Sequence, residues 1–181
     1  MQNEERLLTW KNGFGRHVAE FHQTGRPATS LSFSLSGPTH GWLFFTLDLG
    51  EGGRFTCRAS SVPNNFLCEL VNELRAFFLG APQVCISMHG EPDTFVLQLA
   101  QSSEGNTRFE LHYKPSFEAT EQNIVWGVTT FGTSICNSLY KLVCGFGESC
   151  DMDAYASDMG WDFPSTQLAS LQKILIGHRE T

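Results

Sequence analysis

The sequence predicts an α+β protein, with an antiparallel sheet of about six or seven strands and two or three helices packed mainly on one face. Three observations support this fold class. Short segments alternate apolar and polar residues, as strands do when one face of a sheet is covered. Gly and Pro residues separate these segments. One longer segment repeats its apolar residues with the period of an α-helix.

Length and composition favour a single domain over residues 1–181. The chain is 41% hydrophobic and holds fifteen Phe, so it can bury a sizeable core without disulfide or metal cross-links. Residues 1–28 form the least defined segment, because short apolar patches alternate there with glycines. We expect a short strand or a helical turn in this N-terminal segment.

The first predicted strands are residues 31–36, 41–49 and 54–61. Every second residue in them is apolar, and glycine-containing turns separate them, which is typical of an antiparallel meander. Trp42 and Phe44 lie on the opposite face of their strand from its leucines. If that face of the sheet is open to solvent, the two residues form an exposed apolar patch that is a contact site. If helices cover the face, the two residues are part of the core. We expect core here, and for Trp126 as well, because helices are available to cover the sheet.

A helix is predicted within residues 63–80. It begins at Pro63 or the asparagines after it, and Gly80 with Pro82 ends it. Its apolar residues recur at the spacing of one helical face. They are Leu67, Leu70, Val71, Leu74, Phe77 and Phe78.

The second half of the chain repeats this organisation. Strands are predicted at 84–90, 94–101, 107–114 and 123–132, followed by a helix over 133–146 that Thr133 or Ser134 caps. An acidic loop and a terminal helix from Pro164 to Gly177 complete the chain. Residues 115–181 therefore add a strand, a helix, an acidic loop and a terminal helix.

An internal similarity links the two halves. Residues 55–78 and 124–146 share a strand-then-helix pattern at a constant offset, in which Cys68 corresponds to Cys136. A degenerate duplication and the general pattern of a strand leading into a helix both explain it.

No motif predicts catalysis or a bound cofactor. The chain has no GxSxG elbow, no Walker loop and no CxxC pair. His17 and His22 flank Glu20 without the HExxH spacing of a zinc site. Residues 151–162 follow part of a calcium-loop frame, but Ala156 replaces the turn glycine and Asp162 the bidentate glutamate. We therefore expect no catalytic residues, no metal and no cofactor.

The six cysteines are expected to be free thiols that pack as small apolar side chains. The chain has a net charge of −7 and an isoelectric point near 5.3, which disfavours nucleic acid and anionic membranes and favours a basic protein partner. Its first residues lack the pattern of a secretory signal, so a cytoplasmic location is expected.

The charge is concentrated between Leu142 and Gln172. This stretch contains five acidic residues and no Lys or Arg, with aromatic residues among them. Aromatic anchors surrounded by acids favour a surface that binds a basic partner. The alternative is a solvated loop whose Trp161 and Phe163 pack into the core. The candidate partner-binding residues are Glu148, Asp151, Asp153, Tyr155, Asp158, Trp161 and Asp162.

The order of segments WLFFTLDL, RFTCRASS, FLCELVNELRAFF, TFVLQLAQ and TRFELHY resembles small bacterial immunity proteins of polymorphic toxin systems, in particular the WapI-like type. The resemblance covers roughly residues 31–114. It implies a non-enzymatic cytosolic protein that binds and neutralises a cognate toxin domain. The strand and helix after Pro115 and the acidic loop depart from this type. Two alternatives remain: a chaperone or adaptor for a secreted effector, and a cysteine-dependent enzyme.

Overall fold

The structure is a computed structural model that describes residues 5–11, 16–91, 93–102, 104–115, 123–130 and 132–177. These residues form nine β-strands and four α-helices, and a 3₁₀ turn at Gly50–Gly52. The strands are β1 (Arg6–Lys11), β2 (His17–Gln23), β3 (Ser32–Thr39), β4 (Trp42–Asp48), β5 (Gly53–Ser60), β6 (Gln83–His89), β7 (Thr94–Gln101), β8 (Thr107–Lys114) and β9 (Asn123–Thr130). The helices are α1 (Phe66–Phe78), α2 (Ser134–Ser149), α3 (Met152–Met159) and α4 (Ser165–Gly177).

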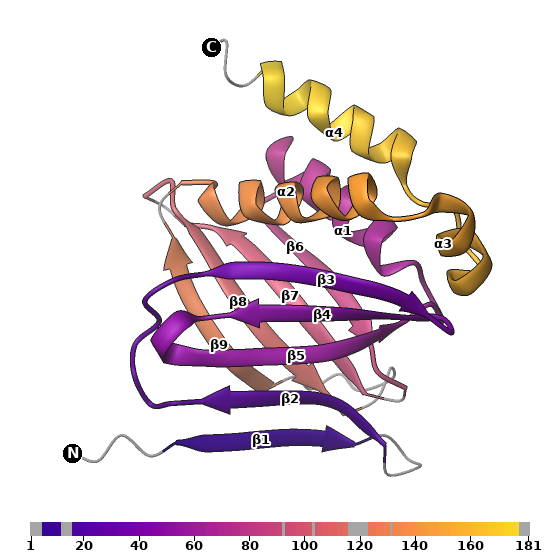
Figure 1. The fold of residues 1–181 in the computed structure, drawn as a ribbon. Helices are drawn as coiled ribbons and strands as arrows, with labels where there is room; N and C mark the ends of the chain where they lie inside the picture. Colours follow the sequence, from indigo (N-terminus) through magenta and orange to yellow (C-terminus); the bar gives the residue numbers. More distant parts are fainter. Residues whose placement is uncertain are drawn as a thin grey trace.

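The strands form two antiparallel sheets instead of the single sheet that the sequence predicts. Sheet A has five strands in the order β1-β2-β5-β4-β3, and sheet B has four in the order β6-β7-β8-β9. The two sheets lie face to face, and their strands cross obliquely (Figure 1). The predicted α+β class is confirmed, whereas the expected strand number is too low because two strands form within residues 1–28.

The core lies between the inner faces of the two sheets. The alternation in β4 buries Leu43, Phe45 and Leu47 completely. Aromatic rings join the sheets, with the rings of Phe55 and Phe95 centred 5.1 Å apart. Burying these side chains is the main favourable contribution to folding.

The N-terminal segment belongs to this core. Phe21 of β2 is fully buried, and the ring of Trp10 in β1 lies 5.2 Å from the ring of Phe95 in sheet B. Strands β1 and β2 therefore complete sheet A, where the sequence predicts only a short strand or turn.

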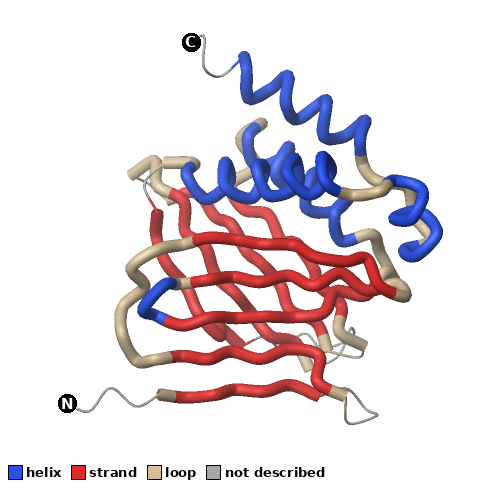
Figure 2. Tube along the Cα trace, viewed as in Figure 1, coloured by secondary structure: helices blue, strands red, loops and turns tan. Residues whose placement is uncertain are grey.

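The helices form a layer at one end of the two sheets (Figure 2). Helix α1 packs along the edge strand β6, and the Glu69 carboxylate accepts a hydrogen bond of 2.6 Å from the Ser87 backbone N–H. Helices α2 and α3 pack along the edge strand β3, and α4 packs on α1. In the described part of the chain no helix packs along β1 or β9, which are edge strands of their sheets. None of the described helices combines the length and apolar character needed to cross a membrane.

The outer face of sheet A corrects a second expectation. No described helix covers this face (Figure 1), and Trp42 and Phe44 are half-buried there, outside the core. The guanidinium of Arg58 lies 5.4 Å from the centre of the Phe44 ring. Trp126 instead faces inward from β9 and packs against Phe109, as expected.

The internal similarity corresponds to equivalent elements. Phe66 starts α1 after the sheet A strand β5, and Ser134 starts α2 after the sheet B strand β9. Each helix then crosses to the other sheet: α1 packs along β6 of sheet B, and α2 along β3 of sheet A.

Candidate protein-binding surface

The acidic segment predicted as a loop contains the helix α3. The Asp151 side chain caps its start by accepting hydrogen bonds from the backbone N–H groups of Asp153 and Ala154, at 3.0 and 3.1 Å. Gly160 ends it in the left-handed conformation, with a φ of 69°. Both signals are present in the sequence, but a helix this short has only two buried residues, Tyr155 and Met159, which is too few to show a helical period.

Tyr155 is not part of the exposed surface, which corrects its place in the candidate set. Its side chain is fully buried, with its ring 5.7 Å from Phe163 and 6.3 Å from Phe146. Burial raises the pKa of its phenol. Its hydroxyl donates a hydrogen bond of 3.1 Å to Asn65 Oδ1, and Asn65 Nδ2 donates one of 3.1 Å to the carbonyl of Asp162. Tyr155 therefore anchors α3 to the N-terminus of α1.

Trp161 is the exposed aromatic residue of the segment. Its side chain is 46% exposed, and its indole N–H donates a hydrogen bond of 2.8 Å to the carbonyl of Ser61. The ring is therefore held in place at the surface instead of being packed into the core. Val62, which is 60% exposed, follows directly in the chain after this hydrogen-bond acceptor. Local sequence patterns miss Val62, because only the tertiary fold brings the turn after β5 to residue 161.

Five candidate carboxylates are exposed in residues 148–162, the stretch of chain that contains Trp161. They belong to the end of α2, to α3 and to the residues after it. We call these carboxylates, with Trp161 and Val62, the acidic surface. The acidic members are Glu148, Asp151, Asp153, Asp158 and Asp162. The alternative prediction, that Trp161 and Phe163 both pack into the core, is correct only for Phe163. The ring of Phe163 packs inward, 6.5 Å from that of Phe146, whereas Trp161 does not.

Charge is unevenly distributed along the chain. Residues 1–60, which contain all of sheet A, hold six Lys and Arg and five Asp and Glu. Residues 61–181 hold six Lys and Arg and fourteen Asp and Glu. The excess of negative charge therefore lies in residues 61–181, which include the helical layer and sheet B, and the acidic surface lies at one end of that layer.

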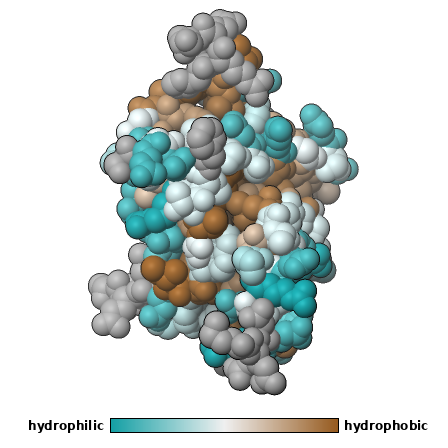
Figure 3. Space-filling view, turned by 90° about the vertical axis from the view of Figure 1, so that its left-hand side faces the viewer, coloured by the Kyte–Doolittle hydropathy of each residue, from teal (hydrophilic) through white to brown (hydrophobic). Residues whose placement is uncertain are grey.

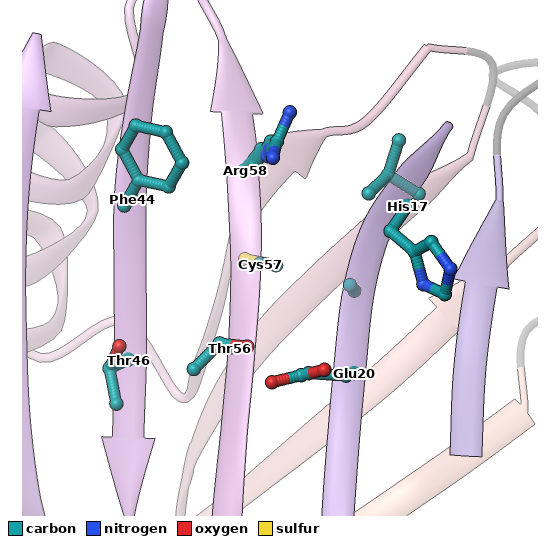
Figure 4. Close-up of a pocket in the computed structure, with 9 residues that line it drawn as sticks. His17, Glu20, Phe44, Thr46, Thr56, Cys57 and Arg58 are labelled. Carbon is teal, nitrogen blue, oxygen red and sulfur yellow. The ribbon is translucent and has the colours of Figure 1, made fainter. Parts of the chain in front are cut away.

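The outer face of sheet A carries a shallow hollow of about 350 Å³. Its lining includes His17 and Glu20 from β2, Phe44 from β4 and Arg58 from β5 (Figure 4). Glu20 pairs with Thr56 across the two neighbouring strands, so the floor of the hollow is ordinary sheet. The mixed charges of its lining give it no single preferred ligand charge.

A polar cluster occupies the outer face of sheet B. Glu110 Oε2 lies 3.1 Å from His112 Nε2 and accepts a hydrogen bond of 3.3 Å from Gln98 Nε2. His112 is buried, and its Nδ1 has no hydrogen-bond partner among the described residues. The described residues contain no group of three or more His, Cys, Asp or Glu arranged to hold a metal ion. The cluster thus joins β7 and β8 through one shared carboxylate.

Four of the six cysteines lie in environments that favour the thiol over the nucleophilic thiolate. Burial raises the pKa of Cys57, and it raises that of Cys136 to about 12. Desolvation also raises the pKa values of Cys85 and Cys150. Cys85 and His89 lie four residues apart along β6, which separates their Cα atoms by about 13 Å, too far for a direct hydrogen bond.

The side of the molecule that carries the N-terminal end of α2 shows several separate apolar patches between polar areas (Figure 3). One patch lies near the top, beside the described end of α4.

Comparison of the chain with protein-family models, curated proteins and solved structures finds no match.

Proposed function

We propose that this chain is a non-enzymatic protein-binding protein of the immunity type, which neutralises a cognate bacterial toxin domain by binding it in the cytoplasm. The acidic surface makes the contact, and the toxin domain contributes a basic surface. The two sheets and α1 serve as a rigid support for this contact.

The observation that carries the proposal is an exposed Trp161, held by a hydrogen bond, in a stretch of chain with five exposed carboxylates. Interface hot spots are enriched in Trp, which buries a large area at a small cost in conformational entropy. The hydrogen bond to Ser61 and the buried Tyr155 hold this region in one conformation before binding. Preorganisation of this kind reduces the entropy lost on association.

The carboxylates and the apolar side chains have different roles. The carboxylates attract a basic partner and accelerate association, an effect that salt screens. Trp161 and Val62 bury apolar area and slow dissociation. The raised pKa values of four of the six thiols add support, because they disfavour the alternative of a cysteine-dependent enzyme.

The test uses a toxin domain encoded beside this gene in its native host, or the protein captured from that host. The double variant Asp153→Lys and Asp158→Lys is expected to slow association about tenfold or more at low salt, and much less at high salt. Glu5→Lys with Glu104→Lys is the matched control, because it changes the net charge equally at exposed sites elsewhere. Trp161→Ala is expected to accelerate dissociation with little change in the association rate.

Equal effects of the two double variants would remove the acidic surface from the proposal. A single substitution in a cleft that abolished turnover of a small substrate would contradict the function itself.

A second function is favoured by one observation. The edge strand β1 exposes two adjacent leucines, Leu7 at 63% and Leu8 at 41%. An open edge strand can bind an extended segment by adding it to the sheet, as a chaperone or adaptor for a secreted effector requires. Tighter binding of unfolded segments than of a folded domain would favour this second function over the first. Leu7→Pro would then weaken that binding, and Trp161→Ala would leave it unchanged.

A further inference from the structure

A groove lies between α2 and α4, next to the acidic surface. In the described part of the chain α4 packs mainly on α1, and side chains of both α2 and α4 line the groove. The groove has a volume of about 350 Å³. Its apolar lining residues are Tyr140, Cys144, Met152, Phe163, Leu168 and Ala169.

The floor of the groove is closely packed. The Phe163 ring stacks on Phe146, with ring centres 6.5 Å apart and planes at 29°. Gly147 lets this ring approach α2, because a Cβ at this position would lie 2.7 Å from Phe163 Cζ. The groove is therefore a fixed feature of the surface, as a preformed binding site requires.

Exposed apolar side chains lie at both ends of the groove. Met152 is 38% exposed at the end near α3. Ile176, which is 53% exposed, lies seven residues after Ala169 and so on the same face of α4, about two turns further on. The apolar lining thus extends along α4 beyond the enclosed part of the groove.

Charge differs between the two ends. Glu148 lines the groove near Met152, and the exposed Asp151 and Asp153 flank Met152 in the chain. Lys141 and Lys173 follow the lining residues Tyr140 and Gln172 at the other end. An occupant that matches this pattern has an apolar face along its length and basic residues near Met152.

We propose that the groove binds an amphipathic helix of the partner protein, with apolar side chains against Phe163 and Leu168 and basic residues beside Glu148. Helices commonly bind in this way, with residues at i, i+3, i+4 and i+7 in an apolar groove. The proposal rests on the proposed function, because this helix belongs to the protein that the acidic surface attracts. It goes further by assigning a secondary structure and a charge pattern to the bound segment.

The probe is a fluorescent peptide of about 18 residues built of Leu, Ala and Lys with one leucine stripe, long enough to span the groove as a helix. A scrambled peptide of the same composition, without the stripe, is its control. We expect fluorescence polarisation at low salt to show saturable binding of the striped peptide, at least about tenfold tighter than that of the scrambled one.

The decisive variant is Ala169→Trp, which fills the groove from an exposed position. Thr166→Trp places the same side chain on an exposed site of α4 outside the lining. We expect Ala169→Trp to weaken binding of the striped peptide about tenfold, and Thr166→Trp to change it less than twofold. Circular dichroism melting confirms that both variants fold.

Equal binding of the two peptides, or equal effects of the two tryptophan variants, would overturn the proposal. Light scattering that shows a wild-type dimer, lost in Ala169→Trp, would assign the groove to a second copy of the chain and also overturn it. The outcomes for the proposed function are separate. The striped peptide can bind in the groove while Asp153→Lys and Asp158→Lys leave association with the toxin domain unchanged. This result would retain the groove as a binding site and remove the acidic surface from the proposed function.

Discussion

Helices α1 and α3 meet at one residue, Asn65, but have different surroundings. Helix α1 buries six residues and packs against β6, α2 and α4, whereas α3 buries only Tyr155 and Met159. Asn65 Oδ1 accepts hydrogen bonds from the Cys68 N–H of α1, at 3.2 Å, and from the Tyr155 hydroxyl of α3. The difference separates a helix that supports the fold from one that, in the proposed function, presents side chains to a partner.

Asn65 is the position where this comparison is most easily broken. We expect Asn65→Ala to lower the free energy of unfolding by about 2 kcal/mol, because it removes a helix cap and leaves the buried Tyr155 hydroxyl unpaired. Hydrogen exchange is expected to accelerate most in α3. Asn65→Asp keeps the oxygen that accepts from Cys68 and Tyr155 but turns a second oxygen toward the Asp162 carbonyl, so it is expected to weaken only the contact with Asp162 and to cost less than Asn65→Ala. Uniform acceleration across α1 and α3 would show that the two helices form one cooperative unit.

Asp151 separates the structural and binding roles within α3. We expect Asp151→Ala to cost about 1 kcal/mol, since it removes the N-cap. Asp151→Ser retains a capping oxygen without the charge, so its stability in urea is expected to stay within a few tenths of a kcal/mol of wild type. Both variants are expected to slow association with the toxin domain at low salt. A serine variant that associates at the wild-type rate would leave Asp151 only its capping role.

Glu69 tests the supporting helix through pH. Desolvation is the largest cause that raises its pKa above the ordinary 4.5, against the hydrogen bond from Ser87. A raised folded-state pKa gives stability that is present below 4.5 and lost as pH rises through the raised value. Glu69→Gln removes this pH dependence. Its free energy of unfolding, compared with that of the wild type, is therefore expected to be higher at pH 7 than at pH 4. The difference is expected to be less than about 1 kcal/mol, because the carboxyl is partly solvated.

The measurement is urea unfolding at both pH values, with Glu104→Gln in an exposed turn as the control. Asn64 Nδ2 donates a hydrogen bond to Glu69 Oε2, so an amide at position 69 donates to Asn64 Oδ1 only if the Asn64 side-chain amide turns over. If Glu69→Gln is instead less stable than the wild type at pH 7 and not at pH 4, the hydrogen bond of the charged carboxylate to Ser87 outweighs desolvation.

Much of the fold follows from local patterns. Five of the six buried residues of α1 and the alternation in β4 are visible in the sequence, because each depends on period alone. Phe66, the first residue of α1, is buried without having been predicted, and the predicted Phe78 is only partly buried. The division into two sheets is not visible, since it depends on which strands pair over long distances. The pairing of β2 with β5, about thirty residues apart, completes sheet A, and no periodicity encodes it.

The candidate surface was predictable in charge but not in geometry. The five carboxylates follow from composition, and their exposure agrees with it. Tyr155 and Trp161 are both aromatic residues in an acidic segment, yet one is fully buried and the other 46% exposed. The contacts that distinguish them come from the tertiary fold: Tyr155 bonds to Asn65 and Trp161 to Ser61, 90 and 100 residues earlier.

The exchange of helices between the sheets has a consequence for how the chain can be divided. The edge of β6 is covered by a helix encoded before it, and the edge of β3 by a helix encoded near the end of the chain. A cut between α1 and β6 would produce two fragments. The first contains sheet A and the helix α1 that covers the edge of sheet B, and the second contains sheet B and the helix α2 that covers the edge of sheet A. Such fragments would be poorly soluble apart and would complement each other when co-expressed, because reassembly covers both edges at once.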